Sequence, residues 1–239
     1  MSQLMVVSML LFFGLFARFA PNYLSGLKVT LSLVGLSILL GAALSVPVAF
    51  ARGSRNPLLA WPAYAYVYFF RGTPLLVQIF LVYYGLSQFA AVRASPFWVV
   101  LREPFWCALI AFSLNTAAYT AEIVRGAVQA VPRGQVEAAK AIGMSRLTRM
   151  RRIVMPQAVR IGLPAYGNEI ILMLKASAVV YTVTLMDIMG VIRTINSRTY
   201  QYEMFFLVAG LIYLIITLLF TWLFRRLEIW LKVDASRKR

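Results

Sequence analysis

Residues 29–50, VTLSLVGLSILLGAALSVPVAF, decide the fold, because they form a long apolar run without a single charged side chain. The hydrocarbon layer of a bilayer is about 30 Å thick, and a helix needs about 20 mostly apolar residues to cross it. The whole chain agrees with this reading. It is 61% hydrophobic and 13% charged, whereas a soluble domain has about 25% charged residues. The sequence therefore predicts an all-α integral membrane protein.

Four further apolar stretches predict a total of about five transmembrane helices in a single domain covering residues 1–239. They are residues 74–87, 106–124, 163–183 and 205–224. Thr73 followed by Pro74 resembles a helix N-cap with proline at the first helical position, so the second span is expected to begin at Pro74. Aromatic residues crowd residues 58–70 before it, as in an interfacial belt. Residues 4–16 lack a preceding Lys or Arg, so we expect an interfacial helix there and no signal peptide.

The formal net charge is +16, and the positions of the basic residues predict the orientation. One side of the predicted bundle carries Arg52, Arg55, Arg71, Arg125, Arg133, Lys140, Arg146, Arg149, Arg151, Arg152, Arg160, Arg225, Arg226, Lys232, Arg237, Lys238 and Arg239. The other side carries Arg18, Lys28, Arg93, Arg102, Arg193 and Arg198. Because Lys and Arg accumulate in cytoplasmic loops, the C-terminus is expected in the cytoplasm and the N-terminus outside.

The segment between the third and fourth spans, residues 132–156, predicts a basic helical hairpin in the cytoplasm. Helix formers fill residues 135–142, and Gly143 is a natural C-terminal stop. Ser145 can cap a second helix that ends before Pro156. The spacing of Ala and Gly also resembles a DNA-binding helix-turn-helix, but a reader of DNA grooves gains nothing from being held between two membrane spans. No nucleic-acid partner is expected. A merely solvated basic loop is the plain alternative.

Ionisable residues inside spans are costly, by roughly 2.5 to 3.5 kcal/mol at the centre of the bilayer, and are therefore candidates for function. Glu169 has no cation three or four positions away, and Lys175 projects from another helix face. We expect Glu169, with Asn168 and possible help from Asn115, to line a substrate pathway and to favour a cationic group. A buried structural ion pair is the alternative for Glu169, and helix–helix hydrogen bonding is the alternative for Asn115.

Three other acidic residues are expected to have structural or solvated positions and no role in the substrate pathway. Glu122 forms one helix stripe with Asn115 and Tyr119, and it can pair with Arg125 three positions away. Asp187 and Glu203 are expected in solvated loops at the outer interface.

Several chemistries are excluded by composition. The chain has no histidine and one cysteine, Cys107, so no metal site, His-based catalysis or internal disulfide is expected. A phosphate-binding loop of the type Gly-x-x-x-x-Gly-Lys-Ser/Thr is also absent. The sequence therefore predicts a protein that is not an enzyme and that binds no cofactor directly.

Several motifs resemble a known family. Glu137-Ala138-Ala139, Gly143 and the Ile-Val-Met-Pro that ends at Pro156 resemble the EAA loop of bacterial ABC import permeases, with Met155 where leucine is usual. The run FRGTPLLVQ at residues 70–78, which contains Arg71, Gly72, Thr73 and Pro74, is similar to the polar amino acid permeases, as is NTAAYTAEIVRG at residues 115–126. Residues 182–189 and 193–196 look more like permeases for basic amino acids and opines. One departure is Ala176-Ser177-Ala178, where family members often have Asp-Thr-Ser.

The resemblance implies a type I ABC importer permease fold in a bacterial inner membrane, with the N-terminus in the periplasm. Polar, and especially basic, amino acids or opines would move inward. The hairpin would couple transport to a cytoplasmic ATPase dimer that uses the ATP. A periplasmic substrate-binding protein and a second homologous permease, or a second copy of this chain, would complete the system, and a heterodimer is expected. A secondary transporter is the alternative, but its two-repeat plan does not match.

Overall fold

The computed structural model describes residues 2–231, with side chains from Phe16 onward, and every regular element in that part of the chain is a helix. The C-terminal cations from Lys232 on lie outside the described residues. In chain order the elements are α1 (Ser2–Arg52), α2 (Pro57–Gly72), α3 (Leu75–Phe80), η1 (Leu81–Gly85), η2 (Leu86–Gln88), α4 (Ala90–Arg93), α5 (Trp98–Leu101), α6 (Pro104–Gln129), α7 (Arg133–Ala141), α8 (Arg146–Arg149), η3 (Met150–Val154), α9 (Met155–Ala176), η4 (Ser177–Val183), α10 (Ile188–Thr199) and α11 (Tyr202–Leu231).

The described helices supply five membrane crossings when two bent pairs are counted as one span each. Three helices are long and apolar enough to cross unbroken, namely residues 16–52 of α1, α6 and α11. The helix that begins at Pro57 bends by 107° against residues 75–88, and the helix that ends at Val183 bends by 48° against α10. The predicted all-α fold with about five spans is therefore confirmed.

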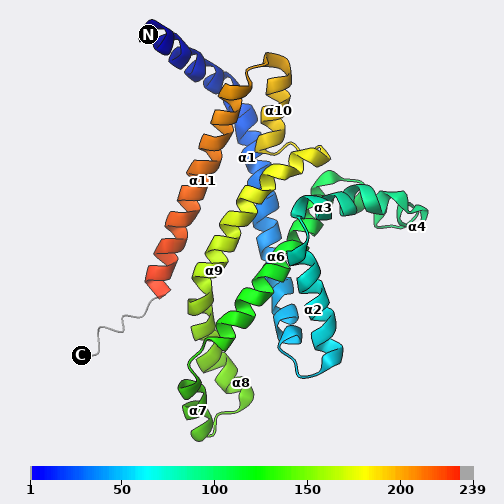
Figure 1. The fold of residues 1–239 in the computed structure, drawn as a ribbon, viewed down its shortest axis with the longest axis vertical. Coiled ribbons are helices and arrows are strands. Elements are labelled where there is room, and N and C mark those ends of the chain that lie inside the picture. The colour runs from blue at the N-terminus through cyan, green and yellow to red at the C-terminus, as the bar shows by residue number, and fades with distance from the viewer. Residues whose placement is uncertain (1, 232–239) are drawn as a thin grey trace.

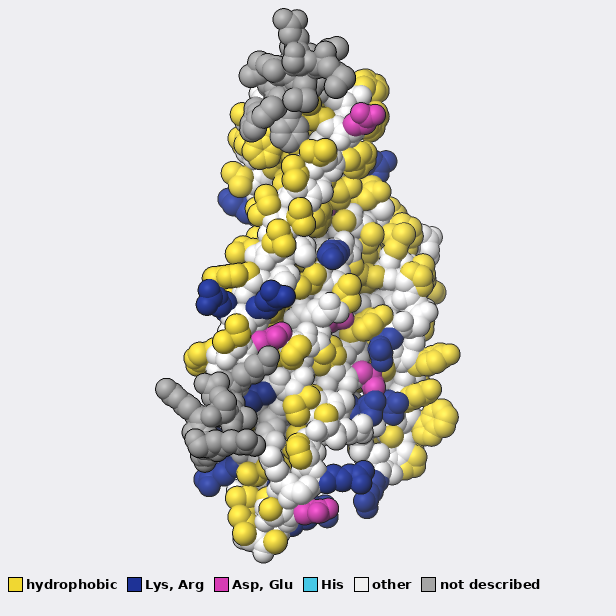
Figure 2. All heavy atoms as spheres, turned by 60° about the vertical axis from the view of Figure 1, so that its left-hand side comes forward, with side chains coloured by type: hydrophobic (Ala, Val, Ile, Leu, Met, Phe, Trp, Pro, Cys, Tyr) yellow, Lys and Arg dark blue, Asp and Glu magenta, His cyan; other side chains and the backbone are white. Residues whose placement is uncertain are grey.

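Helix α6 forms the centre of the bundle, and α11 lies at its periphery (Figure 1). In α6, 67% of the most apolar window is buried, against 22% in α11. Helix α1 packs along α6, and Leu33 of α1 and Phe112 of α6 are fully buried in the shared core. Hydrophobic side chains cover much of the surface in Figure 2, as expected of helices that face lipid, and most of the Lys and Arg in that view lie in its lower half.

The α1–α6 contact depends on a glycine. A Cβ atom at Gly41 would overlap the Cγ2 methyl of Thr116 and would lie 3.3 Å from the backbone nitrogen of Ala117 and from the carbonyl oxygen of Ser113. Small residues at such positions let two helix backbones approach closely in a membrane, where packing drives association. A Cβ at Gly35, on the same helix, would meet nothing within 4 Å.

The first span is longer than expected. The predicted interfacial helix at residues 4–16 does not form a separate element, because α1 runs unbroken from Ser2 to Arg52. Pro21 and Pro47 lie inside it, and a proline in a helix removes one backbone hydrogen bond without ending every helix.

The second span also differs from the expectation. Residues 58–70 belong to α2, a helix of 16 residues that begins at Pro57 behind the Asn56 N-cap. Thr73 does not cap the next helix, since its hydroxyl donates to the carbonyl of Phe69 at 2.8 Å and Pro74 occupies the N-cap position. The positions of the predicted spans put Arg71 in one loop with Arg52, but in the structure Arg71 lies in the last turn of α2.

The hairpin between α6 and α9 forms as predicted at its turn but not at its end. Gly143 has a φ of 78°, and Ser145 accepts a hydrogen bond from the backbone nitrogen of Thr148 at 3.3 Å. The second helix was expected to end before Pro156. Instead, the π-helical turn η3 leads directly into α9, and Pro156 sits in the first turn of α9.

We predict that Gly41→Ala destabilises the purified protein, because the added methyl forces α1 and α6 apart, an overpacking that costs about 1 to 3 kcal/mol. Thr116→Ser removes the clashing methyl and keeps the hydroxyl, so it should partly restore stability in the double variant. Gly35→Ala is the matched control and should be neutral or slightly stabilising. Thermal unfolding in detergent measures all four proteins. Equal midpoints for the Gly41 and Gly35 variants would contradict this account of the contact.

Candidate functional site

The break between α2 and α3 is held together by two buried amide side chains. Gln78 Nε2 donates to the carbonyl of Phe70 at 2.9 Å, to the carbonyl of Thr73 at 3.1 Å and to the hydroxyl of Thr73 at 2.8 Å. Asn115 Nδ2, from α6, donates to the same Phe70 carbonyl at 3.1 Å and to Gln78 Oε1 at 3.0 Å. The last carbonyls of a helix have no partner within it, and lipid offers none. The two amides therefore make the sharp bend tolerable inside the bundle.

Arg71 follows immediately in this turn and is placed against α6. Its guanidinium lies over the ring of Tyr119, 5.1 Å from the centroid, and its carbonyl accepts a hydrogen bond from the Tyr119 hydroxyl at 3.4 Å. The structure gives the guanidinium no hydrogen bond or ion pair to any residue it describes. Arg71 is thus held through its backbone and ring contact, while its charge has no counter-ion in the part of the chain that the structure describes.

A cleft of about 330 Å³ opens in front of Arg71 between α1, α2 and α6. Its lining consists of Arg52, Tyr64, Val67, Tyr68, Arg71, Gly72 and Glu122. The guanidinium of Arg52 lies 4.6 Å from the centroid of the Tyr64 ring. The cleft therefore combines aromatic faces with two cations and one carboxylate.

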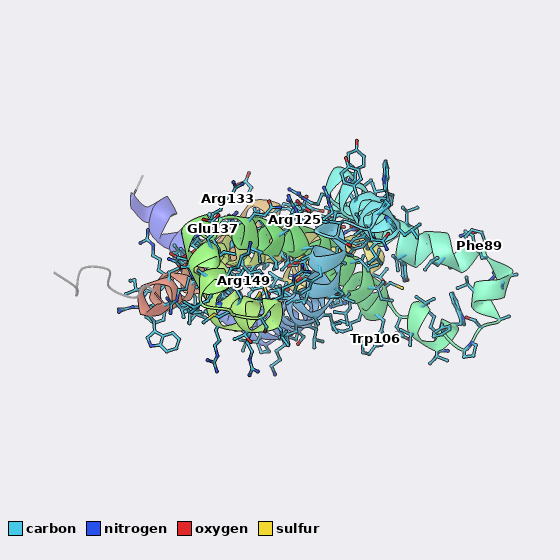
Figure 3. All side chains as sticks on the ribbon, turned by 90° about the horizontal axis from the view of Figure 1, so that it is seen from below. Phe89, Trp106, Arg125, Arg133, Glu137 and Arg149 are labelled. Atoms are coloured by element: carbon cyan, nitrogen blue, oxygen red, sulfur yellow. The ribbon has the colours of Figure 1, made fainter. Side chains whose placement is uncertain are left out.

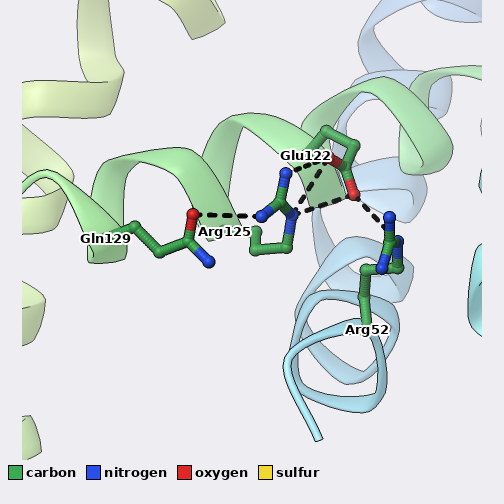
Figure 4. Close-up of polar contacts among 4 residues, drawn as sticks. All are labelled: Arg52, Glu122, Arg125 and Gln129. Atoms are coloured by element: carbon green, nitrogen blue, oxygen red, sulfur yellow. Dashed lines mark hydrogen bonds and ion pairs between the residues drawn. The ribbon is translucent and has the colours of Figure 1, made fainter. Parts of the chain in front are cut away.

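The carboxylate of Glu122 interacts with two arginine side chains. Arg125 Nη2 donates to its Oε2 at 2.6 Å, as predicted for this pair, and Arg52 Nε lies 3.4 Å from its Oε1 (Figure 4). Arg125 Nη1 also donates to Gln129 Oε1 at 3.0 Å. Charge-assisted hydrogen bonds of this kind are strong. The network ties the end of α1 to α6 and leaves Glu122 no free charge for a ligand.

Glu169, in contrast to Glu122, forms no ion pair among the described residues. Glu169 is 7% exposed, and the hydroxyl of Thr116 on α6 lies beside its carboxylate. Among the described residues no cation lies within ion-pair distance, and the charge of Arg71 acts on the carboxylate from further away. Lys175 and Asn168 are exposed, and neither forms a described ion pair or hydrogen bond with Glu169. The ion-pair alternative for Glu169 is therefore not formed among the described residues.

The structure brings some of the predicted pathway residues together and separates others. Asn115 is buried but faces the α2–α3 break, whereas Thr116, the next residue, faces Glu169. Asn168 and Glu169 differ in exposure because neighbours on a helix point about 100° apart. Asn115 thus contacts the motif at residues 70–78, and Glu169 lies on another side of α6.

Sequence reasoning missed the burial of Gln78 and Asp187. Gln78 interrupts the apolar run LLVQIFLV, and an amide in such a place signals a helix contact in a membrane. Asp187 was expected in a solvated loop, but it is fully buried and caps α10, accepting from the backbone nitrogen of Gly190 at 2.8 Å. Tyr213 also donates to it, at 3.4 Å. An Asp three residues before a Gly at a helix start is the pattern that could have revealed this cap.

The hairpin presents its tip at the end of the molecule opposite the start of α1 (Figure 1). In the view from below, Glu137 and Arg133 on α7 and Arg149 on α8 surround that tip (Figure 3). Glu137, Ala138 and Pro156 are exposed, and Ala139 is buried. Two large apolar side chains at the turn are also exposed: Ile142 is 73% exposed and Leu147 is 78% exposed.

Comparison with known proteins places the chain in a family. A profile for the inner membrane component of binding-protein-dependent transport systems matches residues 41–233. The nopaline transport system permease protein NocM of Agrobacterium fabrum is 48% identical over 88% of this chain and 88% of its own length. The octopine permease OccM of Rhizobium radiobacter is 50% identical over 86% and 84%. The histidine/lysine/arginine/ornithine permease HisM of Escherichia coli is 42% identical over 85% and 86%.

Solved structures agree on the fold. A crystal structure of an amino acid ABC transporter with histidines has a chain that superposes with a TM-score of 0.81 at 36% identity, over 89% of this chain and 95% of that one. The inward-facing methionine ABC transporter MetNI gives a TM-score of 0.73 at 19% identity, over 90% and 99%, which supports the fold alone. The chain belongs to the family of inner membrane components of binding-protein-dependent transport systems, and it has the fold of a type I ABC importer permease.

Proposed function

We propose that the chain is the permease subunit that carries basic amino acids or opines from periplasm to cytoplasm. The observation that carries the proposal is the carboxylate of Glu169, which is buried against α6 and forms no ion pair with any residue that the structure describes. An uncompensated charge inside a membrane protein is costly and marks a substrate path by default. An ammonium or guanidinium group supplies the missing charge. The substrates named for NocM, OccM and HisM support the same class.

The family membership implies an ATPase and a substrate-binding protein as partners. ATP use is assigned to the cytoplasmic ATPase dimer, because the chain lacks the phosphate-loop motif. We expect no cofactor on this subunit. A second, homologous permease completes the pathway in our proposal, with a second copy of this chain as the other possibility. The resemblance of residues 182–189 and 193–196 to permeases for basic amino acids and opines supports a heterodimer.

The hairpin of α7 and α8 is proposed as the element that receives force from the ATPase. Glu137, Ala138 and the two open apolar side chains, Ile142 and Leu147, supply a contact surface. Ala139 packs inward, which keeps α7 against the rest of the hairpin. Gly143 sets the angle between the helices, because its φ of 78° suits glycine better than other residues. Pro156, in the first turn of α9, continues the segment into the bundle.

The proposed orientation puts the hairpin and C-terminus in the cytoplasm and the start of α1 in the periplasm. It rests on the excess of Lys and Arg at the hairpin end. In Figure 1 both α1 and α11 run downward, so that α11 ends away from the start of α1 and nearer to the hairpin, as an odd number of crossings requires.

We predict that Gly143→Ala uncouples ATP hydrolysis from uptake in the reconstituted transporter. A Cβ in the left-handed region costs roughly 1 to 2 kcal/mol, enough to shift the hairpin angle in most molecules. Gly143→Asn should retain more activity, because asparagine tolerates this conformation. Gly134→Ala, at an unstrained position of α7, is the control. The ratio of substrate transported to phosphate released measures coupling. An unchanged ratio in Gly143→Ala would remove Gly143 from the coupling element.

We predict that Glu169→Ala lowers uptake of labelled arginine or octopine into proteoliposomes by about tenfold or more, because a hydrogen bond to a charged group contributes roughly 1.5 to 3 kcal/mol. Glu169→Gln keeps the shape and should lose uptake while keeping the melting temperature. Glu103→Gln, at an exposed ion pair with Arg102, serves as control. Full uptake by Glu169→Ala would rule out this residue as part of the pathway.

We predict the orientation from thiol labelling in a Cys107→Ser background, which removes the buried native cysteine. A cysteine at Ala138 should react with a membrane-impermeant maleimide in inside-out vesicles and not in intact spheroplasts. A cysteine at Tyr200, which is 75% exposed between α10 and α11, should show the reverse. The opposite pattern would invert the topology.

A further inference from the structure

A second pocket in the bundle, which we call the apolar pocket, is separate from the cleft at Arg71. It lies between residues 42–50 of α1, 120–127 of α6 and 155–166 of α9, and its volume is about 380 Å³. None of the described residues that line it is charged, so neither charged end of an amino acid would find a partner there. Among its few hydroxyl groups, that of Ser45 donates to a carbonyl of its own helix at 2.8 Å. The lining therefore fits an apolar ligand.

Small side chains create the space in the apolar pocket. Ala127 of α6 and Ala158 and Gly162 of α9 line it. A Cβ atom at Gly162 would lie 3.1 Å from the Cβ atom of Ala127, so α6 and α9 are in close contact at this point. Two larger side chains of the lining reach the surface, since Phe50 is 56% exposed and Val159 is 52% exposed. The pocket is thus closed on the side where α6 meets α9, and it opens beside Phe50 and Val159.

The length of the apolar pocket matches one leaflet of a bilayer. Its lining on α9 extends from Met155 to Tyr166, a rise of about 17 Å at about 1.5 Å per residue. Half of the hydrocarbon layer is about 15 Å thick. The end at Met155 is the shallow one, because this residue directly follows η3 of the hairpin. The pocket therefore has the length of a lipid acyl chain in the leaflet at the hairpin end of the bundle.

Unpaired cations lie beyond the shallow end of the apolar pocket. Arg151 and Arg152 of η3 precede Met155 by four and three positions, so both lie about one helical turn beyond that end. Both arginines are exposed, and neither forms an ion pair with any residue that the structure describes. From residue 123 to residue 168 the sequence has eight Lys and Arg against one acidic residue, Glu137. An anionic headgroup at this end would therefore meet an excess of positive charge.

We propose that the apolar pocket binds one acyl chain of an anionic phospholipid, with Arg151 and Arg152 beside its headgroup. Such a lipid combines the two features that the site requires, namely a long apolar tail and a negative charge at the shallow end. In the proposed orientation the lipid belongs to the cytoplasmic leaflet. Its chain fills the space between α1 and α9 at the level where α9 enters the membrane from the hairpin. The proposal goes beyond the transport function and does not depend on which substrate is carried.

The test is the retention of lipid by the detergent-purified complex of permeases and ATPase. The complex is equilibrated with equal amounts of phosphatidylglycerol and phosphatidylcholine that have identical acyl chains, and native mass spectrometry counts the bound lipids. The wild-type complex should prefer the anionic lipid by roughly fivefold for each arginine, or about 25-fold for two. Arg151→Gln combined with Arg152→Gln should abolish this preference. Val159→Trp, which fills the pocket from its opening, should remove one bound lipid per copy of the chain.

Matched controls change the same residue types outside the apolar pocket. Leu218→Trp, at a side chain of α11 that is 58% exposed, should retain lipid as the wild type does. Arg133→Gln combined with Arg146→Gln removes two exposed cations of the hairpin and should keep the preference. Val46→Trp fills the pocket from α1 and repeats the test if Val159→Trp fails to fold.

Two results would overturn the proposal. An unchanged preference in the variant without Arg151 and Arg152 would remove them from the headgroup site. Equal lipid retention by the wild type and by both filling variants would show that no lipid occupies the apolar pocket. In that case a cysteine at Val159, in the Cys107→Ser background, would report by cross-linking whether the second permease covers the pocket instead.

Discussion

The structure depends on keeping backbone carbonyls hydrogen-bonded where a membrane helix is broken. Between α2 and α3 the chain turns by 107°, which frees the carbonyls of Phe70 and Thr73 from helical partners. Lipid cannot replace those partners, so an irregular segment survives only when buried protein groups do. Gln78 and Asn115 provide them. The bend is therefore an ordered part of the bundle and not a loop between two spans.

The same bend helps to determine which charged side chains lack an ion-pair partner among the described residues. By ending α2 at Gly72, it leaves Arg71 in the last turn, against the ring of Tyr119 and facing the cleft. Glu122 is already shared by two arginines from α1 and α6. Burial of a charge is tolerated when it is paired, and the Glu122 network meets that condition. Arg71 and Glu169 do not, and this contrast separates a structural ion network from residues available to a ligand.

The sequence predicts features that depend on local pattern. The α6 span, the α11 span, the pairing of Glu122 with Arg125 and the turn at Gly143 all follow from apolar length, helical spacing or a residue with special backbone freedom. It does not predict features that depend on distant partners. The Asn115–Gln78 contact joins residues 37 positions apart, and the burial of Asp187 depends on Tyr213 of another helix. Single-sequence patterns contain no information on such pairs.

One incorrect expectation strengthens the proposed mechanism. Had the second hairpin helix ended before Pro156, a flexible joint would separate the hairpin from the membrane. Instead η3 joins α8 to α9 without interruption. From Met155 to Glu169 the helix rises by about 1.5 Å per residue, roughly 20 Å in all. A continuous helix transmits rigid-body displacement over such a distance, whereas a loose loop absorbs it. The continuous helix thus connects the hairpin that carries the proposed coupling surface to the buried carboxylate of Glu169.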